Sequence, residues 1–427
     1  MMMSNTDATK TTALRTNRLY IDLSSGHGFA LANIALHHDV DHVIVRKSPT
    51  FHVHTGAPDD DDDDNVMRDS TTTSTEDDLI TLEAIGKLQY LTRLDLVDFE
   101  EYTGNNRIGS GSLPILGLAK LLQHAHKLTT LRLNSVHVTG SRADFDAFLQ
   151  VLSTTTTLLE VVYLMDCLPA RESPHLQGMA AALSRLPTLR VVEIVETRHA
   201  PPASWSGKAL ATLCTSPYLE TLRVRGVRWL HDHQIELLAQ AIIDKSNSKN
   251  NTSTCHLKEL SLLCNDMGPR AVTALCDMLR SNHSIEMLCL NRIALHGASA
   301  ENLAHALAHN TSVRQLHLYF HLPHQHACSK YNHDYYVSVQ DLRTLFLQHC
   351  LMDKNYTLEK IVGGWACDDI HLFCKLNTAG RKRLLVSNEN GNKASKHQWV
   401  NVLASQQDDV RSLYYLLSQN PTLCCEC

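Results

Sequence analysis

The sequence lacks an excess of basic residues and lacks a long apolar run. Its 427 residues hold 39 Lys+Arg against 45 Asp+Glu, a formal net charge of -6, whereas nucleic-acid-binding domains carry a basic patch or stripe. The apolar segment Phe29–Leu36 is much shorter than the roughly 20 residues of a membrane helix. The polar start, Met1 to Tyr20, has no apolar core of a secretory signal. We therefore expect no nucleic-acid partner, no membrane span and an intracellular protein, cytoplasmic or nuclear.

Sequence motifs for catalysis are missing as well. The chain contains no GxSxG nucleophile motif, no phosphate-binding P-loop and no dinucleotide fingerprint. The short run Gly109–Gly111 lies in a polar insertion and lacks the preceding strand that a phosphate cradle requires. We predict that the protein is not an enzyme and uses no cofactor.

The thirteen cysteines do not form the pattern of a disulfide framework. They are scattered, and the CxxC spacing occurs only at the end, from Cys424 to Cys427. Cys264, Cys276 and Cys289 fall within strand or helix patterns, which favours reduced and partly buried thiols. Five Asn-x-Ser/Thr tripeptides are interpreted as chance patterns rather than glycosylation sites, because no secretory signal precedes them: Asn250, Asn251, Asn282, Asn310 and Asn355.

What the sequence does contain is an internal repeat. The segment Leu257–Asn265 is followed at shifts of 28 residues by Ile285–Ile293 and by Val313–Leu318, and no gap is needed. The shared frame is LxxLxL. A degenerate first copy is Val40/Val43/Val45, and a weak last copy is Leu358/Ile361, with Gly363 at the third position. The frames between them and upstream of Leu257 are Leu91/Leu94/Leu96, Leu128/Leu131/Leu133, Leu159/Val162/Leu164, Leu189/Val192/Ile194 and Leu219/Leu222/Val224.

Segments with a helical period separate the frames. Their apolar residues recur three and four positions apart, which is typical of amphipathic helices. Short strands that alternate with helices can bury their apolar sides by stacking, which gives a parallel sheet on one surface and helices on the other. The predicted helices are Leu113–Leu122, Phe145–Leu152, Met179–Leu186, Ala209–Leu213, Ile235–Ile242, Ala271–Leu279, Leu303–Leu307 and Val339–Leu347.

On these frames the chain resembles leucine-rich-repeat proteins of the ribonuclease-inhibitor-like class, over about Val40 to Ile361. The resemblance implies an α/β fold, a right-handed solenoid (horseshoe) with parallel strands on the concave face and helices on the convex face. In that family an Asn three residues after the frame bridges neighbouring turns, and here only Asn265 fills this slot. The string Leu376–Arg381, with Trp399 and Asn420–Cys424, resembles a C-terminal block of diatom leucine-rich-repeat proteins, which implies a closing cap.

The chain is therefore divided into four segments. Residues 1–57 form an N-terminal segment with the degenerate first repeat, 58–79 an acidic Ser/Thr-rich disordered loop, 80–368 the repeats, and 369–427 a helical cap with a Cys-rich end. The cap contains three helical patterns and a capping box from Ser395 to Gln398. Its predicted helices are Ile370–Leu385, Gln398–Ser405 and Val410–Leu417.

Two polar loops hold candidate sites of another kind. His321–Cys328 contains three histidines and a cysteine that could bind zinc, but it has no CxxC or HExxH frame. The histidine-rich composition explains the cluster better, so we predict no metal site. In the acidic loop, Ser74 and Thr75 each precede an Asp by three residues, a pattern that acidophilic kinases favour. The loop can also serve only to keep the protein soluble.

The candidate binding site is the strand surface. In LxxLxL the leucines point inward, so the residues that alternate with them face the concave side. An apolar set around Tyr163 and Glu193 is followed by a basic row, Arg223 and Arg225, with Arg228 and Trp229 nearby. Aromatic, Met and Arg side chains are typical of protein-binding hot spots, although strands also tolerate exposed apolar residues. The predicted partner-binding residues are Arg132, Tyr163, Met165, Glu193, Arg223, Arg225, His317 and Tyr319.

We predict a non-enzymatic scaffold that binds another protein on this face. Two alternatives stay open. One is a GTPase-activating protein, because one family of this repeat class activates a nuclear-transport GTPase, although that family has an acidic C-terminal tail and this chain has its acidic run near the N-terminus. The other is a substrate adaptor of a ubiquitin ligase, although the first ninety or so residues lack an F-box-like start.

Overall fold

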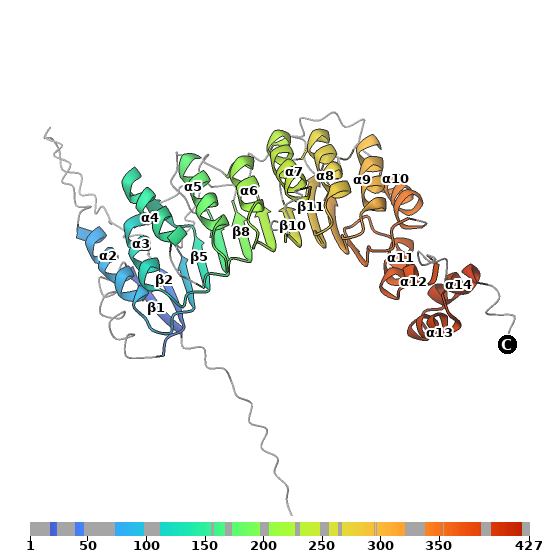
Figure 1. The fold of residues 1–427 in the computed structure, drawn as a ribbon, viewed down its shortest axis with the longest axis horizontal. Coiled ribbons are helices and arrows are strands. Elements are labelled where there is room, and N and C mark those ends of the chain that lie inside the picture. The colour runs from blue at the N-terminus through green and yellow to red at the C-terminus, as the bar shows by residue number, and fades with distance from the viewer. Residues whose placement is uncertain are drawn as a thin grey trace, which may run out of the picture. The chain divides into compact units, whose positions relative to one another are not determined.

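The computed structural model describes residues 18–23, 39–46, 73–97, 112–154, 158–166, 173–196, 205–226, 231–247, 256–263, 267–293, 295, 297–320, 338–352, 354–385 and 394–420. The chain forms two units, Met1–Leu159 and Glu160–Cys427. In both units strands alternate with helices along the chain (Figure 1).

The first unit is built on adjacent parallel strands in chain order. The strands are β1 (Arg18–Asp22), β2 (His42–Arg46), β3 (Arg93–Val97) and β5 (Thr130–Asn134). The helices that pack beside one another are α2 (Thr73–Gly86), α3 (Ile115–His124) and α4 (Arg142–Thr154). A second, two-stranded parallel sheet consists of β4 (Ser112–Pro114) and β6 (His137–Thr139).

The structure adds a strand to one predicted segment and begins a helix inside another. Strand β1 pairs in parallel with β2, so Leu19 stands beside Val43 and Ile21 beside Val45, and residues 1–57 thus contain a strand before the degenerate repeat. Its frame was missed because the first apolar slot is occupied by Thr16. Helix α2 begins at Thr73, inside the range 58–79 that was predicted to be a disordered loop. The rest of that range, 58–72, lies outside the described residues.

The second unit continues the alternation. Its strands follow one another in the sheet as β7 (Val161–Met165), β8 (Val191–Val195), β9 (Thr221–Arg225), β10 (Glu259–Leu263), β11 (Met287–Ile293), β12 (Gln315–Phe320) and β13 (Lys360–Val362). Its helices are α5 (Ser173–Ser184), α6 (Gly207–Cys214), α7 (Asp232–Ser246), α8 (Pro269–Ser281), α9 (Gly297–His309) and α10 (Val339–Leu345), the last continued by a π-helical turn, η3 (Phe346–Leu351).

The frame leucines form the core of the repeats. Leu222, Leu260, Leu288 and Leu316 stand directly beside one another on consecutive parallel strands, and Ile361 extends the column to β13. All five side chains are fully buried or nearly so. The helices lie on one side of these strands (Figure 1). The predicted α/β solenoid with parallel strands on one face and helices on the other is therefore confirmed.

Three successive turns from helix to strand, those before β11, β12 and β13, share a buried asparagine. The side-chain oxygens of Asn282, Asn310 and Asn355 each accept backbone N–H groups from the residues two and three positions later. The side-chain amides donate back to the preceding repeat. That of Asn310 reaches the carbonyls of Leu279 and Asn282 at 2.7 and 3.0 Å, and that of Asn355 reaches Leu307 and Asn310. We call this set the asparagine ladder.

The asparagine ladder corrects the interpretation of the Asn-x-Ser/Thr tripeptides. The hydroxyl two residues after each asparagine also bonds across repeats, since Ser312 Oγ donates to Asn282 O and Thr357 Oγ1 to Asn310 O. The tripeptide is thus a structural motif at these positions and not a chance pattern. Asn282, Asn310 and Asn355 are at most 2% exposed, so the folded chain withholds them from glycosylation. Asn250 and Asn251 lie outside the described residues.

The C-terminal helices close the end of the ladder. They are α11 (Asp368–Thr378), α12 (Arg381–Leu385), α13 (Lys396–Ser405) and α14 (Val410–Gln419). The single helix predicted over Ile370–Leu385 is wrong, because Gly380 takes a φ of 95° and separates α11 from α12. The predicted capping box of Ser395 and Gln398 is confirmed. The side-chain amide of Asn377 donates hydrogen bonds to the carbonyls of Asn355 and Leu358. The cap thus bonds to backbone carbonyls that would otherwise accept hydrogen bonds from a further repeat.

Candidate functional site

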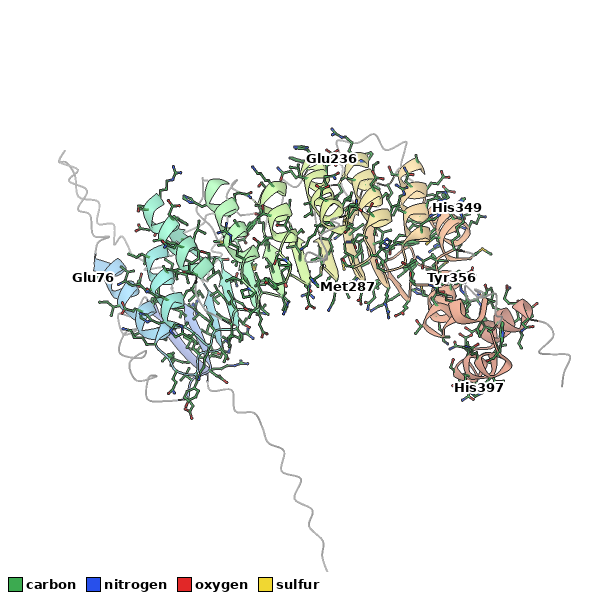
Figure 2. The ribbon with its side chains drawn as sticks, viewed as in Figure 1. Glu76, Glu236, Met287, His349, Tyr356 and His397 are labelled. Atoms are coloured by element: carbon green, nitrogen blue, oxygen red, sulfur yellow. The ribbon has the colours of Figure 1, made fainter. Side chains whose placement is uncertain are left out.

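The candidate site is the strand face of the second unit, defined as the side chains that alternate with the frame leucines. Strand pairing places them in rows: Tyr163, Glu193 and Arg223 stand side by side, and Met165, Val195 and Arg225 form the next row. Figure 2 shows Met287 of β11 on this side of the sheet and Glu236 of α7 on the helix side. The structure thus brings five of the predicted binding residues together on β7, β8 and β9.

Arg223 and Arg225 both extend from β9 on this face, and Arg223 contacts two glutamates. Its Nε and Nη2 donate to the two carboxylate oxygens of Glu259 at 2.7 and 3.0 Å, and its Nη1 lies 3.6 Å from Glu193 Oε2. The hydrogen bonds to Glu259 raise the pKa of Arg223, so the guanidinium stays charged. The cluster as a whole has one negative charge in excess. Arg225 is exposed, whereas Arg228 and Trp229 lie outside the described residues.

Apolar side chains border this charged cluster. The hydroxyl of Tyr163 donates to Met165 Sδ at 3.4 Å, and both residues are half-buried. Val161 and Val191 stand beside each other in the adjoining row and are half-buried as well. An aromatic ring, a thioether and two valines therefore lie next to a fixed arginine–glutamate cluster, which is a mixed surface suited to a protein partner.

The remaining predicted residues lie farther along the same face. Ser261, Cys289 and His317 are in register on β10, β11 and β12, and Tyr319, which is 39% exposed, lies in the next row. Burial raises the pKa of the Cys289 thiol and lowers the pKa of His317. The thiol is thus protonated at neutral pH, and a protonated thiol is a poor nucleophile. The row offers contact groups rather than a cysteine–histidine pair for catalysis.

A carboxyl group that the sequence interpretation missed lies where β8 ends. Glu196 accepts a hydrogen bond from the backbone N–H of Trp205 at 3.2 Å. Burial raises its pKa to about 7, and the charge of Asp166 contributes in the same direction. Asp166, Glu196 and Gly226 each occupy the position directly after a strand. Gly226 has a φ of 74°, and a Cβ there would collide with the carbonyl of Glu196. An alignment of the repeats at the position directly after each strand would have revealed the carboxyl groups of Asp166 and Glu196.

Glu196 makes the stability of the fold depend on pH. At pH values between the ordinary pKa of a glutamate and about 7, the Glu196 carboxyl keeps its proton in the folded chain and loses it in the unfolded chain. The free energy of unfolding therefore falls as the pH rises through this window. Glu196→Gln stays neutral and still accepts from Trp205. We expect it to raise the free energy of unfolding at pH 8 by about 2 to 3 kcal/mol and to change it little at pH 4. Urea unfolding at both pH values measures this, with the exposed Glu301→Gln as control. Equal gains at both pH values would contradict the assignment.

The predicted residue Arg132 belongs to the first unit. It lies on β5 in register with Asp95 of β3 and is exposed. Asp95 accepts two hydrogen bonds from Arg93, at 2.8 and 3.1 Å, and its Oδ2 lies 3.1 Å from His42 Nε2. Burial alone would raise the pKa of Asp95, but its hydrogen bonds from Arg93 and His42 lower it, so it is ionised. Arg132 thus belongs to the charged residues on the strands of the first unit.

A groove of about 1020 Å³ lies between β13, α11 and α13. Lys360, His371, Lys375 and Gln406 contribute polar groups to its lining. Within the described ranges, the buried Gln406 Oε1 has no hydrogen-bond partner.

The candidate metal and phosphorylation sites fall largely outside the described structure. The loop His321–Cys328 is not among the described residues, and in those that are, no three His, Cys, Asp or Glu side chains cluster as metal ligands would. Ser74 and Thr75 lie at the start of α2, with side chains that are not described. The buried free thiols predicted for Cys276 and Cys289 are confirmed, and Cys264 is outside the described ranges. No described helix is long and apolar enough to cross a membrane.

Comparison with known proteins yields similar structures at low identity. No family model and no curated protein matches the sequence. Leiomodin-1 actin-binding site 2 is 14% identical, with a TM-score of 0.29 over 41% of this chain and 89% of that one. A Bacteroides fragilis protein is 9% identical, with a TM-score of 0.35 over 69% and 70% of the two chains. The plant peptide hormone receptor RGFR1, in complex with RGF2, is 12% identical, with a TM-score of 0.27 over 56% and 37%.

These similarities are too distant to transfer a function. The fold rests on the chain itself, through its parallel strands, its helices on one side and its column of buried leucines. The described residues form an α/β solenoid in which short parallel strands alternate with helices.

Proposed function

We propose that the protein is a non-enzymatic scaffold whose strand face in the second unit binds another protein. The observation that carries the proposal is the set of side chains on β7 to β10, in which Tyr163, Met165 and Arg225 lie on the same face as the Glu193–Arg223–Glu259 cluster. Tyr and Arg supply most of the energy in many protein interfaces. The partner gains from contact with these side chains and from the exclusion of water around them.

The rigidity of this surface supports binding by display. The side chains of the set extend from hydrogen-bonded strands of the parallel sheet. The bidentate bond between Arg223 and Glu259 holds these two side chains in place. A surface already fixed before binding loses little conformational entropy when a partner docks. In this proposal the chain carries out no reaction, and His317 and Tyr319 extend the contact along β12.

The test changes Tyr163 and Arg225 to Ala together. Arg223 is left intact, because its removal would leave two carboxylates next to each other without their shared cation. We expect at least a tenfold loss of partner capture with an unchanged circular dichroism spectrum, about 1.4 kcal/mol or more. Proximity labelling in the native cell, compared between wild type and variant, provides the measurement.

A matched control places the same kinds of change on the helix side. Leu237→Ala with Arg270→Ala removes one exposed apolar residue and one exposed arginine from α7 and α8. Capture should persist in this control. An identical set of labelled proteins in the Tyr163/Arg225 variant would reject the strand face as the site. The identity of the captured protein also distinguishes a scaffold from an activator of a GTPase or an adaptor of a ubiquitin ligase.

A further inference from the structure

The groove between β13, α11 and α13 runs along the edge of a strand. Its lining includes the five consecutive residues Glu359–Gly363, and β13 is the last of the described strands in the sheet order. Successive side chains of a strand point to opposite faces, so five consecutive residues border one groove only along the strand edge. At about 3.3 Å per residue this edge is roughly 13 Å long. An elongated groove of about 1020 Å³ fits an extended segment of chain better than a compact molecule.

Most polar side chains of the groove already have partners within the chain. They bond to other side chains or to backbone carbonyls, and they are Glu359, Lys375, Thr378, Asn401 and Ser405. Within the described part of the chain, three polar groups of the lining make no hydrogen bond or ion pair: the ammonium of Lys360, the imidazole of His371 and Oε1 of Gln406. Lys360 and His371 are exposed, whereas Gln406 is 7% exposed. The groove therefore offers two accessible donors and one buried acceptor.

These three groups define the chemistry of an occupant. Lys360 is a cation, and the imidazole of His371 has an N–H in either neutral tautomer, so both donate hydrogen bonds and both suit a carboxylate. Gln406 Oε1 accepts hydrogen bonds, and a buried acceptor gains from an N–H partner. An acidic peptide supplies both groups, because its backbone provides N–H donors and an Asp or Glu side chain provides the carboxylate.

Lys360 also links the groove to the strand face of the second unit. It stands beside Gln315 in the sheet and precedes Ile361, which is buried in the core, so Lys360 lies on the strand face. Burial and the charge of Lys360 together lower the pKa of His317 on β12, which places both residues on the same face. A protein that docks on the strand face can therefore extend a segment into the groove.

We propose that this groove binds an extended acidic segment of the partner protein. The carboxylate of an Asp or Glu lies against Lys360 and His371, and a backbone N–H of the segment donates to Gln406. This inference rests on the proposed scaffold function and adds the chemistry that one part of the partner must have.

The experiment selects binders of the full chain from a phage library of random peptides of about twelve residues, longer than the edge at about 3.3 Å per residue. We expect the selected peptides to contain Asp or Glu and, in fluorescence anisotropy, to bind more weakly at about 300 mM than at about 50 mM salt. Lys360→Gln with His371→Gln should weaken their binding at least tenfold, and Gln406→Met at least threefold. The control, Lys208→Gln with His233→Gln, removes the same side chains from α6 and α7 and should change affinity less than threefold.

Three results would overturn the proposal. The first is a selection that yields no binder, or only binders without Asp and Glu. The second is equal affinity of the selected peptides for the groove double variant and for its control. The third is complete displacement of the peptide by an equal concentration of N-acetylglutamate, which would assign the groove to a small carboxylate. Partner capture through Tyr163 and Arg225 is measured separately, so failure here leaves the scaffold function intact.

Discussion

Asn310→Ala is expected to lower the free energy of unfolding of the second unit by about 3 kcal/mol. The substitution removes five hydrogen bonds. Two run from the amide to the carbonyls of Leu279 and Asn282, and three are accepted by the side-chain oxygen, from the N–H groups of Ser312 and Val313 and from the Ser312 hydroxyl. Asn310 is 2% exposed, so water cannot easily replace these bonds. A buried polar group without a partner costs about 1 to 3 kcal/mol, and the sum is reduced by local relaxation.

Urea unfolding followed by circular dichroism measures this loss, and Asn302→Ala provides the control. Asn302 is exposed on α9, and Ala is the better helix former, so that variant should be neutral or slightly more stable. Asn310→Asp should cost at least as much as Ala at neutral pH, because a carboxylate oxygen would then face two carbonyl oxygens. An Asn310→Ala variant as stable as Asn302→Ala would show that the asparagine ladder contributes little.

Arg381→Met is expected to have a still larger effect, about 4 kcal/mol. The side chain of Arg381 is fully buried, and its guanidinium donates to the carbonyls of Leu351, Met352 and Asn355. These carbonyls lie at the C-terminal end of η3 and the turn after it, where the helix dipole favours a cation. The aromatic rings of Tyr356 and Phe373 face the guanidinium, with ring centroids 4.7 and 4.9 Å from Arg381 Cζ. Methionine keeps the volume and removes both the bonds and the charge.

The control for Arg381 is its neighbour in the same helix. Lys382→Met removes an exposed charge and should change stability by less than about 0.5 kcal/mol. Arg381→Lys keeps a charge but not the planar fork, so an intermediate loss is expected. Hydrogen exchange provides the measurement, since protection should fall first in α11 and α12. Equal protection in the Arg381→Met and Lys382→Met variants would refute the capping role.

The fold could be predicted because the leucine frame depends on local spacing. Leu260, Leu288 and Leu316 repeat in register in the sequence and in the sheet. Asn282 and Asn310 also align, but their role was missed because each bonds to a repeat that lies next to it only after stacking. Strand β1 was missed because its first frame position is polar, and the break at Gly380 because an apolar period continues on both sides of it.

The candidate site was only partly predictable for a related reason. The alternation of strand side chains placed Tyr163, Glu193 and Arg223 on one face, and strand pairing puts them in one row. Which charges neutralise one another depends on diagonal neighbours across strands, as in Arg223 with Glu259. The shift of the Glu196 pKa depends on burial by a turn that no local pattern shows. Binding by these residues stays a prediction.

The asparagine ladder also limits how the chain can be produced. Three of its tripeptides match the acceptor pattern of oligosaccharyl transfer, which acts on nascent chains before they fold. A sugar on Asn310 would occupy the space of Leu279 and Asn282 and prevent neighbouring coils from docking. Recombinant material routed through a eukaryotic export pathway should therefore misassemble, and material made in a bacterial host should not.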